Sequence, residues 1–335
     1  MSEALVELRS VTTRLLTRDG LKPALIDVDC DVRRGEILGL VGESGSGKSM
    51  TARTIIRALP DGARTTGRVA FDGEDLLAMP PARLRELRGK RMGMIFQEPR
   101  AYIDPLWRVE DHLTEGMRVH DHVDRQTARQ RAGDLLEQVG IADGRRRLRQ
   151  YPGELSGGML QRVMIAGALA GDPDLLIADE ATTALDVTTQ AEIVRILGRL
   201  RDERGLAVLF ITHDLALAST ICDRICVMYA GRIVEAQDRD GIFGDPRHPY
   251  THALLGARPS MSARQEEGLE VIPGRPTSAM NAPPGCSFHP RCPYAQESSG
   301  CMGTVPPLEP VGAGQVACLR HQEIRPSLAH RRAAR

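Results

Sequence analysis

The sequence predicts an α/β fold with a mostly parallel sheet whose strands end in chemically active loops. Three short apolar runs support this prediction: Ile37–Val41, the run in DLLIADE at 174–180, and the run in LAVLFITHD at 206–214. Uninterrupted apolar runs of this length are typical of parallel strands that helices cover on both faces. The segments that follow these runs indicate the chemistry of the protein.

The segment GESGSGKS, after the first run, has the pattern Gly42-x-x-x-x-Gly47-Lys48-Ser49, which is typical of a P-loop. Glycines let the backbone wrap closely, so that its N–H groups point inward at phosphate oxygens. A helix that begins near Lys48 adds its positive N-terminal end. We expect Lys48 to reach the β- and γ-phosphates and the Ser49 hydroxyl to bind Mg²⁺. The predicted nucleotide-binding residues are Gly42, Glu43, Ser44, Gly45, Ser46, Gly47, Lys48, Ser49 and Met50.

The other two apolar runs end in residues with catalytic chemistry. Asp179 and Glu180 end the second run, and His213 follows the third. An aspartate at a strand end can hold Mg²⁺ through water, and the glutamate beside it can polarise the attacking water. A histidine beside the γ-phosphate can position water and phosphate together. These residues indicate hydrolysis of a nucleotide rather than binding alone.

Another anion-binding segment, YPGELSGGMLQRVMIAGALAG at 151–171, precedes the second run. Ser156 is the predicted N-cap of a helix that Gly171 closes. The apolar stripe of this helix comprises Met159, Val163, Ala166 and Ala170. Leu-Ser-Gly-Gly at its start offers N–H groups and a hydroxyl to an anion. Two phosphate-binding surfaces in one chain predict a head-to-tail dimer, in which each chain completes the nucleotide site of the other.

Strand patterns outside these runs predict a separate β-subdomain. Residues 6–16, 68–74 and 224–236 have the composition of strands, and the dipeptides at 72–73 and 230–231 supply turns. We expect these strands to be antiparallel and to flank the P-loop core.

Helical spacing predicts a mostly helical subdomain between residues 100 and 170. Its clearest apolar stripe comprises Ala128, Ala132, Leu135, Leu136 and Val139. Residues 189–205 form another predicted amphipathic helix, which Gly205 ends.

Six motifs follow one another along the chain: the P-loop at 42–49, MIFQEP at 94–99, LSGGM at 155–159, LLIADE at 175–180, ALD at 184–186, and His213. In this order they resemble the motifs of an ATP-binding subunit of an ABC transporter, and the resemblance covers residues 1–245. It implies a P-loop NTPase of the ABC cassette type, with a RecA-like core, an antiparallel β-subdomain and an α-helical subdomain.

The resemblance also implies roles for single residues. Glu180, His213 and the Q-loop glutamine Gln97 are implied catalytic residues, and Ser49, Gln97 and Asp179 are implied to hold Mg²⁺. The implied signature, which serves the ATP of the opposite subunit, comprises Leu155, Ser156, Gly157, Gly158 and Met159. The implied D-loop comprises Ala184, Leu185 and Asp186.

Two positions depart from the common family pattern. Met159 stands where many members have glutamine, a form that resembles the branch of peptide importers. Members often stack adenine on an aromatic residue near the N-terminus, but the first aromatic residue here is Phe71. Leu15 lies about where the ring is expected, so we expect an apolar contact between Leu15 and adenine.

The pattern changes after residue 245. DPRHPYTHALLGARPS at 245–260 resembles the HPY segment of ATPases that serve oligopeptide, dipeptide and nickel importers. We therefore predict an HPY-type extension and a proline-rich linker at 246–283. A cysteine module is predicted at 284–320, and a tail at 321–335.

Four of the seven cysteines, Cys286, Cys292, Cys301 and Cys318, fall within 33 residues. Their thiolates suit zinc or an iron–sulfur cluster. The paired C-x₂₋₄-C hooks typical of zinc are missing, and a proline follows Cys292, as in many iron–sulfur ligand runs. The pattern C-x-F-x-x-R-C-P-x-A also resembles the C-terminal segment of dipeptide and oligopeptide ATPases, where a 4Fe–4S cluster is bound. We therefore favour a 4Fe–4S cluster, with zinc as the alternative.

The cysteine module has little apolar sequence, so we expect its metal centre to have a structural role. ATP hydrolysis by the rest of the chain is then expected to continue largely without it. Cys30, Cys222 and Cys226 have the settings of ordinary buried residues.

Charge and hydropathy narrow the class of partners. Lys and Arg number 44, as do Asp and Glu, so the net charge gives no reason to expect a nucleic-acid partner. No stretch reaches the roughly 18 apolar residues that span a bilayer, and the first residues do not form a signal peptide. We expect a peripheral protein on the cytoplasmic face of the cell membrane.

The resemblance implies an ATP-hydrolysing subunit that powers the import of dipeptides or oligopeptides. The implied partners are two membrane permease subunits, a second ABC ATPase subunit that is identical or related, and a substrate-binding protein that acts through the permeases. Nickel, glutathione and oligosaccharide are alternative cargoes for the same ATPase. A soluble ABC ATPase acting on DNA or ribosomes is an alternative of another class.

Overall fold

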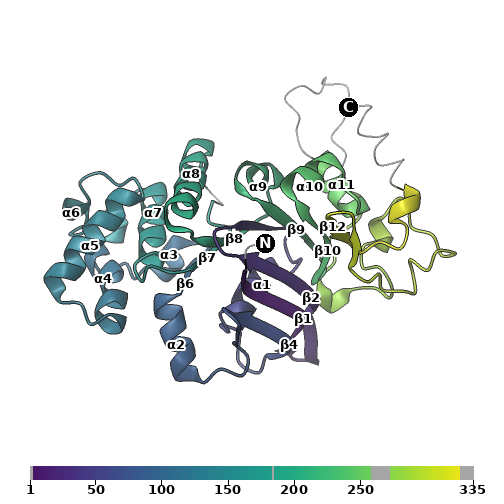
Figure 1. Ribbon diagram of the computed structural model, residues 1–335, viewed down its shortest axis with the longest axis horizontal. Helices are drawn as coiled ribbons and strands as arrows, with labels where there is room; N and C mark the ends of the chain where they lie inside the picture. Colours follow the sequence, from purple (N-terminus) through teal and green to yellow (C-terminus); the bar gives the residue numbers. More distant parts are fainter. Residues whose placement is uncertain (1–2, 183–184, 258–271, 325–335) are drawn as a thin grey trace. The chain divides into compact units, whose positions relative to one another are not determined.

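The structure is a computed structural model that describes residues 3–182, 185–257 and 272–324. The chain forms two compact units. The helical unit comprises the described parts of 1–6, 31–37 and 70–211. The P-loop unit comprises the described parts of 7–30, 38–69 and 212–335. Both units mix helices and strands, as an α/β fold requires (Figure 1).

The strands are short in the core and long at the start of the chain. Their bounds are β1 Ala4–Thr17, β2 Gly20–Arg33, β3 Ile37–Val41, β4 Arg64–Phe71, β5 Glu74–Asp75, β6 Met92–Ile95, β7 Leu175–Asp179, β8 Ala207–Thr212, β9 Arg224–Tyr229, β10 Arg232–Asp238, β11 Glu309–Val311 and β12 Gly314–Val316.

The α-helices are α1 Lys48–Ile55, α2 Pro81–Lys90, α3 Pro99–Tyr102, α4 Val109–His120, α5 Arg125–Gln138, α6 Gly144–Arg147, α7 Gly157–Ala168, α8 Val187–Arg204, α9 Leu215–Ile221, α10 Arg239–Gly244 and α11 Pro249–Gly256. Short 3₁₀ helices occur at Pro152–Glu154, Ala279–Asn281 and His289–Arg291. Within the described residues, no helix is both long and apolar enough to cross a membrane.

In the helical unit, β6, β7 and β8 pair in parallel. The register aligns Met92 with Leu175 and Leu175 with Ala207. Every residue of β7 and β8 is buried, because helices cover parallel strands on both faces. The carboxyl ends of these strands therefore lie along one edge of the sheet, where ligands bind in α/β folds.

Helices α4 to α7 gather into one bundle of the helical unit, which confirms the helical subdomain predicted between residues 100 and 170 (Figure 1). All five residues of the predicted stripe are buried; four lie in α5, and Val139 is its C-cap. The predicted helix at 189–205 is α8, and Gly205 ends it in a left-handed conformation with φ 64°.

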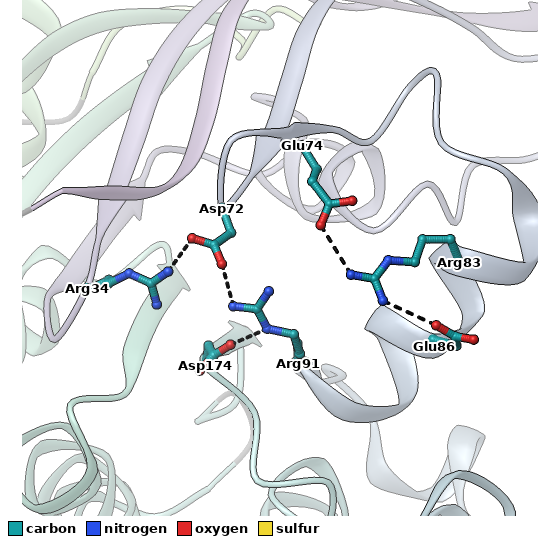
Figure 2. A network of polar contacts seen from close by, with 7 residues as sticks. All are labelled: Arg34, Asp72, Glu74, Arg83, Glu86, Arg91 and Asp174. Carbon is teal, nitrogen blue, oxygen red and sulfur yellow. Dashed lines mark hydrogen bonds and ion pairs between the residues drawn. The ribbon is translucent and has the colours of Figure 1, made fainter.

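A network of ion pairs fastens the amino-terminal ends of β6 and β7 (Figure 2). Arg91, between α2 and β6, donates through Nε to Asp174 Oδ2 at 2.5 Å and through Nη2 to Asp72 Oδ2 at 2.7 Å. Arg34 also binds Asp72. Hydrogen bonding from Arg91, and then from Arg34, lowers the pKa of Asp72. The network lies at the opposite end of these strands from the edge that carries the predicted catalytic residues.

A second cluster in the same view joins α2 to β5 (Figure 2). Arg83 binds Glu74 and Glu86, each at 3.2 Å. The side chains of this cluster are 45–63% exposed, so its ion pairs contribute little to the stability of the fold.

In the P-loop unit, β3 pairs in parallel with β9, and Leu38 is aligned with Arg224. Strand β10 is antiparallel to both β9 and β12, and β11 is antiparallel to β12. Strands β2, β1 and β4 are neighbours in that order in a different sheet. Helix α1 leaves the P-loop directly after β3.

The placement of residues 224–236 in an antiparallel β-subdomain was wrong. The turn at 230–231 is present, with φ 46° at Ala230 and 78° at Gly231, but its strands β9 and β10 belong to the sheet that contains β3. All residues from Ile225 to Tyr229 are buried, as in a strand covered on both faces. A hairpin pattern predicts the turn but does not say which sheet receives the hairpin.

The end of α7 also differs from expectation. Ser156 caps its start, as predicted, but the helix ends at Ala168 rather than at Gly171. Val163 and Ala166 are buried, whereas Met159 and Ala170 are only half-buried. Leu160, Met164 and Ile165 complete the buried face of the helix.

Candidate nucleotide-hydrolysing site

The P-loop wraps around the ammonium group of Lys48. Lys48 Nζ donates to the carbonyl oxygen of Gly42 at 2.7 Å and to that of Glu43 at 3.0 Å. The N–H of Ser46 also donates to the Glu43 carbonyl, at 3.2 Å. Lys48 is only 4% exposed, so its charge is held at the start of α1. A loop and helix start of this kind are suited to binding an anion, and the phosphate contacts of these residues stay a prediction.

Two glycines of the P-loop are required by close packing and by conformation. A Cβ added to Gly42 would lie 2.2 Å from the carbonyl oxygen of Met228 in β9. Gly47 has φ 113°, which an L residue rarely adopts, and its Cβ would lie 3.0 Å from Leu25 Cδ2. The backbone of the loop therefore lies directly against the strand beside it.

The remaining predicted residues of the loop differ in exposure. Ser44 and Gly45 are exposed, Ser49 and Met50 are half-buried, and Ser46 is 2% exposed. Leu15, predicted to contact adenine, is half-buried on β1 in the same unit. Its contact with adenine stays a prediction.

The structure brings Gln97 and Glu180 together in the helical unit. Gln97 Nε2 donates to Glu180 Oε2 at 2.9 Å. Asp179, the last residue of β7, is 5% exposed, and Glu180 follows it with φ 49°. The N–H of Glu180 donates to the carbonyl oxygen of Ile211 in β8 at 3.0 Å. The backbone thus fixes Glu180 at the strand end while its carboxylate faces the Q-loop glutamine.

His213 follows β8 directly and is exposed. The next residue, Asp214, caps α9 by accepting from the N–H of Ala216 at 2.7 Å. This cap fixes the backbone beside His213, and the catalytic role of His213 stays a prediction.

The signature residues begin α7 as expected. Ser156 Oγ accepts from the N–H of Met159 at 3.3 Å, and Gly157 is exposed. A Cβ on Gly158 would lie 3.0 Å from Thr189 Cγ2, so α7 and α8 meet closely here. A hollow of about 310 Å³ lies beside Ser156, Gly158 and Met159. Leu155 is buried and anchors the segment.

Asp186 of the predicted D-loop is the N-cap of α8. Its carboxylate accepts from the N–H of Thr189 at 3.0 Å and from the Thr189 hydroxyl at 2.7 Å. These bonds lower the pKa of Asp186, the backbone bond contributing most. Leu185 is half-buried, and Ala184 lies outside the described residues.

The HPY segment is fastened to the P-loop unit by the buried Glu235. Its carboxylate accepts from the N–H of Arg247 at 2.8 Å and from that of His248 at 2.9 Å. Burial raises the pKa of Glu235. Tyr250, in the first turn of α11, is fully buried, and its hydroxyl oxygen accepts from the N–H of Glu43 at 2.9 Å.

The four clustered cysteines line one small apolar cavity of about 20 Å³, together with residues that include Phe288 and Ile324. Burial raises the pKa of Cys292 to about 11 and that of Cys318 to about 12. Across the described part of the chain, no group of three or more His, Cys, Asp or Glu residues could hold a metal ion. The four cysteines therefore share a cavity, but the structure does not arrange them as a metal-binding group. Cys30, Cys222 and Cys226 are buried, as predicted.

Sequence reasoning missed Arg291, which lies between Cys286 and Cys292 and binds the P-loop glutamate Glu43. Prolines at 290 and 293 flank the Arg291–Cys292 pair and mark a constrained backbone. No local signal identified the partner, because Glu43 and Arg291 are 248 positions apart.

A P-loop, a glutamine–glutamate pair at the end of a buried strand and a serine-capped Leu-Ser-Gly-Gly helix together define a nucleotide-hydrolysing cassette. Comparison with known proteins agrees with this class. Residues 25–183 match the ABC transporter family, and residues 234–301 match the family described as oligopeptide/dipeptide transporter, C-terminal region.

Curated relatives match nearly the whole chain. A probable peptide ABC transporter ATP-binding protein, y4tR of Sinorhizobium fredii, is 44% identical over 96% of this chain and 97% of its own length. The oligopeptide transport ATP-binding protein OppD of Escherichia coli is 42% identical over 96% of this chain and 95% of its own length. The chain therefore belongs to the ABC transporter family of ATP-binding proteins, in its oligopeptide/dipeptide branch, and its activity is ATP hydrolysis.

Solved structures agree with the cassette fold. The ATP-binding cassette MJ0796, in a dimeric post-hydrolysis state with ADP and phosphate, has a TM-score of 0.63 and 28% identity, covering 70% of this chain and 98% of that one. The protein cbiO1 of Clostridium perfringens, part of the ABC transporter complex cbiONQ, has a TM-score of 0.63 and 26% identity, covering 73% of this chain and 92% of that one.

Proposed function

We propose that this chain hydrolyses ATP to power the import of dipeptides or oligopeptides through a multi-subunit ABC transporter. The observation that carries the hydrolytic part is the hydrogen bond from Gln97 to Glu180, directly after Asp179 at the end of β7. The cargo is supported by the relatives, which are peptide transporter proteins and match both the cassette and the C-terminal region.

The proposed chemistry is attack of water on the γ-phosphate of ATP, which yields ADP and phosphate. The P-loop N–H groups and Lys48 bind the phosphates, while Glu180 orients the water and takes its proton. Ser49, Gln97 and Asp179 are the residues that would hold Mg²⁺, which supplies positive charge against the phosphate oxygens. His213 is proposed to contact the γ-phosphate and the water together.

A second ATPase subunit, identical or related, is proposed to complete the site. The signature, Leu155 to Met159, presents a serine hydroxyl at the start of α7 beside an open hollow, a geometry suited to a phosphate. In the proposed head-to-tail dimer, this surface meets the ATP of the partner, and the D-loop around Asp186 lies at the same junction. The cassette MJ0796, with the same fold, is dimeric.

An exposed groove of the helical unit, lined by both apolar and charged residues, is proposed to receive a cytoplasmic segment of a membrane permease subunit. The groove, of about 780 Å³, is lined by residues that include Leu106, Trp107 and Val119, of which Leu106 is 81% exposed. Apolar exposure of this kind marks interaction surfaces. Phe96, beside Gln97, stacks on Tyr102 at 3.8 Å between ring centroids, so the segment that leads to the groove is connected to the Q-loop.

The protein is proposed to act on the cytoplasmic face of the cell membrane, as a peripheral subunit bound to two permease subunits. A substrate-binding protein on the other face is proposed to deliver the cargo to the permeases. The balanced charge of the chain supports the absence of a nucleic-acid partner.

A 4Fe–4S cluster held by Cys286, Cys292, Cys301 and Cys318 is proposed for the cysteine module, with zinc as the alternative. Their shared cavity supports a common metal centre. Zinc needs its four sulfurs at bonding distance from one ion, whereas a cluster spreads its thiolates around a larger core. The absence of paired C-x₂₋₄-C hooks and the proline after Cys292 favour the cluster over zinc.

The function is tested by replacing Lys48 with Ala in a cell that makes the transporter. Because Lys48 holds the P-loop and the phosphates, we expect uptake of a labelled oligopeptide to stop while uptake of free amino acids continues. Lys90→Ala is the matched control, since Lys90 is exposed and pairs with Asp121. Normal peptide uptake with Lys48→Ala would refute the proposal.

A further inference from the structure

The cysteine module binds the P-loop through one buried arginine. Arg291 Nη1 donates to Glu43 Oε2 at 2.6 Å, and Nη2 donates to Glu43 Oε1 at 3.1 Å. Each terminal nitrogen of the guanidinium therefore donates to one oxygen of the carboxylate. This two-bond geometry is the strongest for an arginine–carboxylate pair. The side chain of Arg291 is 4% exposed and that of Glu43 is 23% exposed.

The surroundings of Arg291 hold it in one position. Its Nε donates to the carbonyl oxygen of Pro273 at 2.8 Å, and its guanidinium lies 5.8 Å from the ring centroid of Tyr229 and 5.9 Å from that of Phe288. Burial disfavours its charged form, but the hydrogen bonds to Glu43 and Tyr229, together with the charges of both partners, outweigh burial and raise the pKa of Arg291. A buried guanidinium of this kind depends on its partner carboxylate.

Glu43 is in turn part of the hydrogen-bonded frame of the P-loop. Its carbonyl oxygen accepts from Lys48 Nζ and from the N–H of Ser46, and its own N–H donates to the hydroxyl oxygen of Tyr250. Tyr250 and Phe288 pack together at 5.2 Å between ring centroids. The side chain and the backbone of Glu43 are thus both held by residues from beyond position 245, and the carbonyl oxygen of the same residue binds Lys48 Nζ.

We propose that Arg291 is a positioning residue for ATP binding, and that its ion pair with Glu43 makes the affinity of the P-loop for ATP depend on the folded cysteine module. The inference rests on the proposed ATP-binding function. Arg291 directly precedes Cys292, so unfolding of the segment around the cysteines releases Glu43 and loosens the loop around Lys48. The module is therefore an extension of the nucleotide site, not only a structural appendage.

The test measures the dissociation constant of ATP for the purified full-length chain, by displacement of a fluorescent ATP analogue. We expect Arg291→Met and Glu43→Gln each to raise the constant about five- to tenfold, at the lower end of typical coupling between sites. The dissociation constant of the double variant is expected to be no higher than that of the weaker-binding single variant, since the two residues act as one pair. Arg291→Lys should recover part of the affinity, because lysine keeps the charge but not the two-nitrogen fit.

The matched control is Arg239→Met, because Arg239 is exposed and pairs with the exposed Asp240. We expect this control to bind ATP as the parent chain does. If Arg291→Met does not fold, the test relies on Glu43→Gln. Glu43 is the more exposed member of the pair, and glutamine has nearly the same shape as glutamate. Parental ATP affinity in Glu43→Gln, or in a folded Arg291→Met, would overturn the proposal.

Reciprocity supplies a second readout, because ATP must stabilise the cysteine module by the same factor that the module strengthens ATP binding. Hydrogen exchange at residues 286–292 should slow when ATP is added to the parent chain, and should respond less in Arg291→Met. Equal responses would overturn the proposal. A parent chain that binds no ATP would instead refute the proposed function itself, so the two failures are distinguishable.

Discussion

Replacing Glu180 with Gln should abolish most ATP hydrolysis while leaving ATP binding intact. The Gln97 amide donates to one carboxylate oxygen of Glu180 at 2.9 Å, and a glutamine at 180 still offers an oxygen to this donor. The backbone of residue 180 is held separately, by its N–H bond to Ile211. The substitution therefore preserves shape and position and removes only the charge and basicity of the carboxylate.

The size of the effect follows from the role of the carboxylate as a general base. Such a group typically contributes about 100- to 10,000-fold to the rate, so kcat should fall by this factor. At 1.36 kcal/mol for each factor of ten, the loss of transition-state stabilisation is about 2.7 to 5.4 kcal/mol. The dissociation constant of ATP should change less than about twofold, because the phosphates are bound mainly by the P-loop.

The assay compares phosphate release by the parent chain, Glu180→Gln and the matched control Glu86→Gln under saturating Mg-ATP. Glu86 is exposed and pairs only with Arg83 among the ion pairs of Figure 2, so its variant should hydrolyse ATP at the parental rate. A Glu180→Gln variant that released phosphate at the parental rate would refute the role assigned to this residue. A large loss of ATP affinity would show that the carboxylate acts in binding instead.

The remaining predictions concern the signature and the cysteines. Ser156→Arg should leave ATP affinity of the same chain nearly unchanged but suppress hydrolysis in a homodimer, because the signature serves the opposite P-loop; loss of ATP binding by the isolated monomer would contradict this. Protein purified without oxygen should be brown, with about four irons and four sulfides per chain. The Cys292→Ser variant should lose this brown colour, and its residues 284–320 should become sensitive to protease. Stoichiometric zinc without sulfide would contradict the cluster.

The sequence predicted best those parts of the fold that depend on local patterns. Ile37–Val41 is a strand, α1 begins at Lys48, and Ser156 caps α7, because each depends on residues close together in the chain. The run from Ile225 to Tyr229 was assigned to the wrong sheet, because the choice of partner strand depends on packing that a local pattern does not encode.

The candidate site residues show the same contrast between local sequence patterns and contacts that depend on the fold. Gln97 was placed in the site only by resemblance to a family, yet the structure gives it a direct bond to Glu180. Arg291 was overlooked because an arginine between two cysteines looks like an ordinary solvated charge. We had expected ATP hydrolysis to be largely independent of the cysteine module, and the bond from Arg291 to Glu43 argues against that independence.

The pair formed by Glu43 and Arg291 has a consequence for synthesis of the chain. Its members are 248 positions apart, and the loop that binds phosphate emerges from the ribosome long before the residue that braces it. At bacterial and eukaryotic elongation rates this interval is about 12 to 50 seconds. A growing chain is therefore expected to hold an incompletely braced nucleotide loop until its last segment has folded, so that full ATP affinity is acquired only by the finished protein.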